Sequence, residues 1–168
     1  MHRVAFEIQQ LTTDIQRHAR NFFHEILGID EDEDFAGHEP VSTEALARFA
    51  ADPANGPDLA DLHFDVDKGM RSEWNKAALG LMQIKFCAEL SEHYDSVPAR
   101  SSQYFEQLIQ EKFQRLVGVW KRAQPRMTAS GEPESHEAVE TRMMSDKDVE
   151  LKVCRHTTRR LNVSQHWQ

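Results

Sequence analysis

Residues 101–123 read SSQYFEQLIQEKFQRLVGVWKRA, and this stretch decides the fold class. Its apolar residues recur at intervals of three and four, which is the period of one face of an α-helix. Ser101 or Ser102 can cap the start of this helix, and Pro125 cannot continue it. We therefore predict an amphipathic helix whose apolar face carries Phe105, Leu108, Ile109, Phe113, Leu116, Val117 and Trp120.

The stretch before it predicts a partner helix that begins after Ser72. Pro98 separates the two helices, so we expect an antiparallel helical hairpin. Trp74 and Trp120 should be buried as the largest side chains of the hairpin core. The apolar stripe of the partner helix is expected to contain Trp74, Ala77, Ala78, Leu81, Ile84, Ala88 and Leu90.

Two more helices are expected nearer the N-terminus. Apolar residues at helical spacing fill residues 4–27, and Gly28 stands where a C-terminal cap belongs. The apolar stripe widens towards Gly28, which predicts that the second half of this helix is buried. A short helix can follow Pro40, with Ser42 as its N-cap. Leu62, Phe64 and Val66 then alternate with polar residues, which predicts one short extended segment.

These elements predict a mainly all-α protein with a three- to four-helix core in residues 1–123. Pro, Gly and Ser residues with almost nothing apolar follow in residues 124–135, which we interpret as a linker. Residues 136–168 show only a weak helical pattern, so we expect a loosely helical, flexible tail.

The charges are unevenly distributed along the chain. Residues 1–69 carry 15 acidic and 5 basic residues, whereas residues 70–126 carry 9 basic and 6 acidic ones. Lys112, Arg115 and Arg122 fall within an arc of about 80° on the predicted helix 101–123, beside its apolar face. Together with Lys121 and Arg126 they are our candidate residues for binding a nucleic-acid backbone. The alternative is an ordinary solvated flank of the helix.

A second candidate site lies in the predicted extended segment. His63, Asp65 and Asp67 would share one face of a strand, and an imidazole with two carboxylates can hold a divalent cation. This arrangement would suit a metal-dependent hydrolase. The alternative is that the three are the outward residues of an amphipathic segment. The acidic run at residues 30–34 is interpreted as a solvated loop.

Other classes of protein find little support in the sequence. No phosphate-binding loop or nucleophile motif is present, and we predict no cofactor. No apolar stretch is long enough to span a membrane, and no signal peptide is visible. Cys87 and Cys154 are far apart, so we expect free thiols and an intracellular protein of the nucleus or cytoplasm.

Three stretches together resemble the N-terminal half of an expanded family of uncharacterised proteins from mushroom-forming fungi. The first is Asn21–Gly28, the second runs from Asn55-Gly56-Pro57 through Phe64–Asp67 to the Ser-x-Trp-Asn-Lys stretch at residues 72–76, and the third is Tyr104–Arg122. The resemblance covers about residues 4–123 and transfers no site residues. Trp74 and the Trp120-Lys121-Arg122 end also resemble Myb-like or trihelix DNA-binding domains, although no third helix fits between Leu90 and Ser101.

The sequence thus favours a non-enzymatic interaction module, with a protein partner and an association with nucleic acid through the basic helix face. The alternatives are the metal-dependent hydrolase at His63, Asp65 and Asp67 and a structural subunit of a larger helical assembly.

Overall fold

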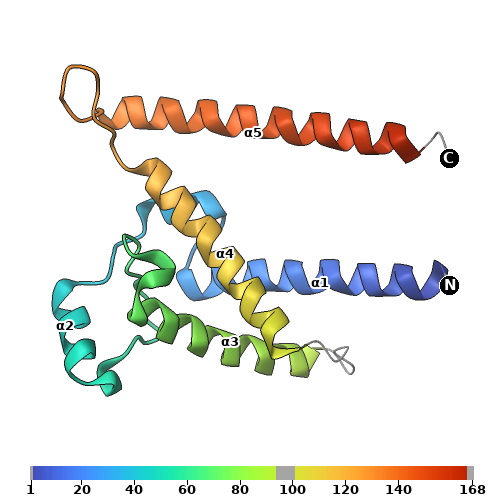
Figure 1. Cartoon of the computed structure of the whole chain (residues 1–168), viewed down its shortest axis with the longest axis horizontal. Helices are drawn as coiled ribbons and strands as arrows, with labels where there is room; N and C mark the ends of the chain where they lie inside the picture. Colours follow the sequence, from blue (N-terminus) through green and yellow to red (C-terminus); the bar gives the residue numbers. More distant parts are fainter. Residues whose placement is uncertain (1, 94–100, 166–168) are drawn as a thin grey trace. The chain divides into compact units, whose positions relative to one another are not determined.

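The computed structural model describes the backbone of residues 2–93 and 101–165 and the side chains of residues 10, 12–92, 101–149 and 151–153. The chain forms two compact units, residues 1–120 and 121–168. As predicted, the protein is all-α, with five α-helices, three short 3₁₀ helices and no strand among the described residues (Figure 1). In chain order the elements are α1 (His2–Leu27), η1 (Asp32–Gly37), α2 (Thr43–Ala51), η2 (Pro53–Asn55), η3 (Gly69–Arg71), α3 (Glu73–His93), α4 (Ser102–Ala123) and α5 (His136–Gln165).

The ends of the first two helices follow the predicted caps. Gly28 has φ +62°, a conformation that an L side chain rarely adopts, and it directly follows the last residue of α1. The amide of Ile29 there donates to the carbonyl of His24 at 3.0 Å. Ser42 caps α2, because its hydroxyl oxygen accepts a hydrogen bond from the amide of Ala45 at 3.1 Å.

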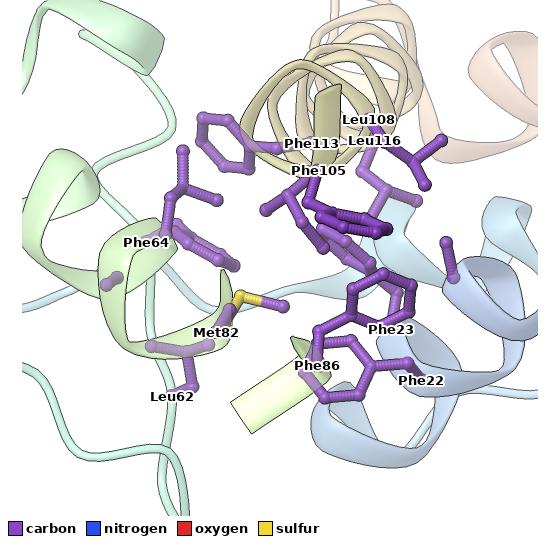
Figure 2. Close-up of a cluster of buried hydrophobic side chains, with 14 of the residues drawn as sticks. Phe22, Phe23, Leu62, Phe64, Met82, Phe86, Phe105, Leu108, Phe113 and Leu116 are labelled. Carbon is purple, nitrogen blue, oxygen red and sulfur yellow. The ribbon is translucent and has the colours of Figure 1, made fainter. Parts of the chain in front are cut away.

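One hydrophobic core fills the first unit, and α1, α3, α4 and the irregular segment before α3 all contribute to it (Figure 2). Phenylalanine rings dominate this core. Phe86 of α3 lies edge-on to Phe22 of α1, with ring centroids 5.2 Å apart. The ring centroids of Phe64 and of Phe113 on α4 are 4.6 Å apart. Fully buried members of the core include Phe23, Phe35, Phe64, Met82, Phe86, Phe113, Leu90 and Leu116.

The burial of α4 matches the predicted face, and that of α1 matches in its described second half. On α4, Phe105, Leu108, Ile109, Phe113, Leu116 and Val117 are buried, and Trp120 is half-buried. On α1, Ile15, Ala19, Phe22 and Phe23 are buried, while the side chains of its first turns lie outside the described residues.

The predicted buried stripe of α3 is wrong in its centre. Leu81 is 41% exposed and Ile84 is 71% exposed, whereas Leu79, Met82 and Phe86 face the core. The physical reason is that α3 has apolar residues around most of its circumference, so helical spacing alone does not select a face. On the buried side, Met82 and Phe86 are fully enclosed.

The two tryptophans of the predicted hairpin lie at the edge of the core. Trp74 is 7% exposed and packs edge-on against Phe49 of α2. Trp120 is half-buried, so its predicted burial is only partial. Each indole N–H donates to a backbone carbonyl, that of Trp74 to His63 at 2.8 Å and that of Trp120 to His38 at 3.1 Å. Phenylalanines therefore supply the core volume that we expected from tryptophan.

The hairpin of α3 and α4 stays a prediction, since residues 94–100 between the two helices lie outside the described part. The side-chain amide of Gln83 donates to the carbonyl and the hydroxyl of Ser102, at 3.1 and 3.2 Å. The first residue of α4 thus lies beside the middle of α3.

The segment that we predicted as extended has no regular secondary structure over residues 62–65 and then turns into η3. The amide group of Asn75, which is fully buried, ties this segment to α3. Its oxygen accepts a hydrogen bond from the amide of Asp65, and its nitrogen donates to the carbonyls of Asp65 and Gly69, each at 2.8 Å. Leu62, Phe64 and Val66 are buried as the alternation predicts.

In the second unit, the segment of residues 124–135, which we interpret as a linker, has local backbone contacts of its own. Met127 and Pro133 make an isolated antiparallel bridge, and Thr128 and Glu132 are linked by a backbone hydrogen bond of 2.8 Å. The guanidinium of Arg142 on α5 pairs with Glu134 at 2.8 Å and donates to the carbonyl of Arg122 at 2.6 Å. The expected tail begins as one continuous helix, α5, and its flexibility stays a prediction.

Candidate nucleic-acid interface

Lys112, one of the five basic candidates, is not available to a ligand in the way that we predicted. It is 3% exposed, and its ammonium forms an ion pair with the carboxylate of Asp32. Its neighbours one turn away on α4, Leu108 and Leu116, are both buried, so Lys112 lies beside the apolar face. The prediction that Lys112 is part of an open basic stripe is therefore wrong.

Arg115, Lys121 and Arg122 are exposed on α4. Within the part of the chain that the structure describes, none of these three side chains forms an ion pair. Arg126 is also exposed, and its backbone amide donates to the carboxylate of Glu134 at 3.0 Å. Arg115 belongs to the first unit, whereas the other three residues belong to the second unit.

A groove of about 550 Å³ lies between α1 and α4 in the first unit. It brings Arg20 of α1 to the same hollow as Lys112 and Arg115, and sequence analysis had not assigned Arg20 to any site. Arg20 is exposed and is without an ion pair among the described residues. Arg20 and Lys112 lie 92 residues apart in the sequence, so helical spacing could not predict that they line the same groove. The remaining lining residues are Gln16, Ala19, Asp32, Leu108, Glu111 and Gln114.

Asp32 lies where the acidic segment meets this groove. Its carboxylate is 2.8 Å from Nε2 of His24 and is paired with Lys112. Burial alone would raise the pKa of Asp32, but the hydrogen bonds from His24 and Lys112 and their charges hold it below its usual value. The acidic run is thus more than the solvated loop that we predicted, because one of its carboxylates is bound to the folded domain.

Lys112 experiences two opposing influences. Burial lowers the pKa of its ammonium below the usual value, although Asp32 acts against this shift. The positive charges of Arg115 and Arg20, which line the same groove, lower the pKa of Lys112 further. A dianionic or monoanionic group placed among them would relieve this repulsion.

The predicted metal ligands His63, Asp65 and Asp67 are not brought together. Nδ1 of His63 donates to the carbonyl of Glu39 at 2.8 Å, and Nε2 lies 3.2 Å from the carboxylate of Asp61. The pKa of His63 is raised, mainly by the hydrogen bond to Glu39. Burial lowers this pKa, but the charge of Asp61 raises it further.

Asp65 turns inward, which also contradicts the alternative that all three residues face outward. It is 7% exposed, and its carboxylate lies 3.5 Å from the ammonium of Lys68, while Asp67 is exposed. The backbone hydrogen bonds to Asn75 fix this inward direction. In the described part of the chain, no group of three or more His, Cys, Asp or Glu side chains is arranged to hold a metal ion.

Cys87 is a free thiol on α3, as predicted, and burial raises its pKa, so it is a poor nucleophile at neutral pH. The side chain of Cys154 lies outside the described residues. None of the helices, as far as they are described, has the length and apolar character needed to cross a membrane.

Comparisons with protein-family models, with curated proteins and with solved structures found no match to this chain. The resemblance to a family from mushroom-forming fungi therefore stays a prediction, as does the resemblance to Myb-like domains.

Proposed function

We propose that this protein is a non-enzymatic interaction module that binds the phosphate backbone of nucleic acid through exposed basic residues of α4. The observation that carries the proposal is that Arg115, Lys121 and Arg122 are exposed and that, among the described residues, no carboxylate pairs with them. A cation that is already neutralised inside the protein contributes little to counterion release, whereas a cation without an ion pair contributes fully.

The other side of α4 supports this assignment indirectly. Its apolar residues are buried in the core, so the helix presents only its polar side to a ligand. The aromatic side chains of α4 are buried or half-buried, so their ring faces are not exposed for nucleobases to stack on. We therefore expect binding that depends on charge and salt and depends little on base sequence.

The test measures fluorescence anisotropy of a short labelled DNA duplex with the intact chain at about 50 mM and about 200 mM salt. We expect weak binding that falls steeply as the salt concentration rises. Arg115→Glu combined with Arg122→Glu should abolish it. Lys76→Glu combined with Lys85→Glu is the control matched in charge, because both are exposed cations on α3 that are already paired, Lys76 with Glu73 at 2.6 Å and Lys85 with Glu89 at 3.3 Å.

Absence of binding at low salt, with the fold verified by circular dichroism, overturns the proposal. An equal loss in the α4 double variant and in the Lys76→Glu/Lys85→Glu control would also overturn it, because both change the net charge by the same amount and the effect would then follow net charge alone. The protein partner that the sequence predicts is a separate expectation that these variants do not address.

A further inference from the structure

The groove between α1 and α4 has the size and the charge of a binding site for a small anionic group. Its volume of about 550 Å³ falls within the range of about 300–1,000 Å³ that is typical of ligand pockets. Three cations line it, Arg20, Lys112 and Arg115, against two carboxylates, Asp32 and Glu111. All of these residues belong to the first unit.

The cations differ in what they can offer to a ligand. Lys112 is buried and its charge is engaged by Asp32. Arg20 and Arg115 are exposed, and neither has an ion pair within the described ranges. Two planar guanidinium groups facing one hollow suit the bidentate hydrogen bonding of phosphate oxygens. Gln16 and Gln114 add two amide groups that can donate to further oxygens.

No aromatic residue lines the groove, so it offers nothing on which a nucleobase can stack. The site therefore suits the phosphodiester group itself and not the base. Asp32 is the internal anion of the same site, since its carboxylate lines the groove and is paired with Lys112, the buried cation of the three.

We propose that the groove formed by Arg20, Arg115 and the Asp32–Lys112 pair binds a phosphodiester group of the nucleic-acid backbone, and that the carboxylate of Asp32 limits the affinity by neutralising the charge of Lys112. This inference rests on the proposed nucleic-acid association and adds to it a specific site, a new residue, Arg20, and an internal anion.

The decisive variant is Arg20→Gln, because Arg20 is exposed and its replacement leaves the core intact. We expect affinity for the labelled duplex to fall several-fold and the slope of log K against log salt to become shallower by about 1. Arg17→Gln is the matched control on the same helix. Arg17 is 63% exposed, pairs with Asp14 at 3.3 Å and does not line the groove, so its replacement should change neither quantity.

The second variant removes the internal anion. Asp32→Asn should raise the affinity by about fivefold, which is the effect of a modest charge interaction. Since this change leaves buried Lys112 without its partner, the double variant Asp32→Asn with Lys112→Met is measured alongside it. The double variant removes one acidic and one basic group, so we expect affinity close to that of the unchanged protein.

Competition with inorganic phosphate distinguishes a free anion from the backbone. Phosphate should displace the duplex only at concentrations far above that of the nucleic acid, because a free phosphate ion fills the groove alone. A duplex also places neighbouring phosphates near the other exposed cations of α4. If the unchanged protein binds no duplex at low salt, the proposed function and the groove both fail. If it binds and Arg20→Gln behaves like Arg17→Gln, the groove is excluded while the proposed function stands.

Discussion

Two helices of nearly equal length, α3 with 21 residues and α4 with 22, are built into the same core by different means. On α4 the apolar side is buried and the opposite side is polar, so its orientation follows from amphipathicity. On α3 both sides are apolar, and Leu81 and Ile84 remain exposed while Phe86 is buried. A helix without amphipathic contrast must be oriented by something else.

For α3 the orienting contacts are polar. Asn75 makes three hydrogen bonds of 2.8 Å to the segment before the helix, and Trp74 donates to His63. Hydrogen bonds are directional, so they fix the rotation of the first turn of α3 more precisely than apolar contact does. A short polar frame at one end of a helix can thus select which of its faces is buried.

Truncating one side chain on each side of α3 tests which side is buried. Phe86→Ala should lower the free energy of unfolding by about 3–5 kcal/mol, because it leaves a cavity in the core. Ile84→Ala, on the exposed side, should change it by no more than about 0.5 kcal/mol. Urea denaturation followed by circular dichroism measures both. Equal costs for the two changes would show that α3 is rotated relative to the orientation described above.

The second prediction concerns the polar frame. Asn75→Ala should lower the free energy of unfolding by about 2–3 kcal/mol, since the buried amide of Asp65 loses its acceptor. Gln83→Ala is the control on the same helix, because Gln83 also donates hydrogen bonds but in an exposed setting. Its cost should stay below about 1 kcal/mol. If the control costs as much as Asn75→Ala, the buried frame is not what orients α3.

The third prediction concerns His38, which lies between the frame and the end of α4. Its Nε2 accepts a hydrogen bond from the amide of Phe64, its ring stacks on Phe35, and its carbonyl accepts from Trp120. Burial, together with the nearby charge of His63, lowers the pKa of His38 to about 4. The unfolded chain therefore binds a proton in the window between pH 6.5 and pH 4 that the folded protein does not bind.

Stability should accordingly fall as the pH is lowered through this window, by about 2 kcal/mol between pH 7 and pH 5. His63 acts in the opposite direction, because its raised pKa adds stability below its usual pKa that is lost as the pH rises. Asp32, whose pKa is lowered, loses its contribution only below this window. His38→Gln should remove most of the fall when urea denaturation is repeated at both pH values. A fall of the same size in His38→Gln would assign it to other groups.

The same difference between local and distant contacts determines which features of the fold could be predicted from the sequence. The caps at Gly28 and Ser42 and the apolar face of α4 were predicted because each depends on neighbours in the sequence. The buried side of α3 packs against Phe22 and Phe105, which lie elsewhere in the sequence, and helical spacing carries no information about which side that is.

The candidate site shows the same limit. The exposure of Arg115 and Arg122 was predicted from the helical arc, but the burial of Lys112 was not. Its partner Asp32 lies 80 residues earlier, within a run of acids that looked uniformly solvated. Arg20 joined the groove for the same reason, since only the packing of α1 against α4 brings it there.

The hydrogen bonds of Phe64 and Asp65 have a consequence for exchange with deuterium. Both amides belong to a stretch without helix or strand, and such amides ordinarily exchange within seconds to minutes. Here their acceptors are the side chains of His38 and Asn75. The two amide protons should therefore exchange as slowly as those inside a helix, and the Phe64 proton should accelerate when His38 takes up a proton. The exchange rates of these two amide protons, followed by NMR, would thus report whether α3 is packed on the segment before it and whether the ring of His38 is neutral.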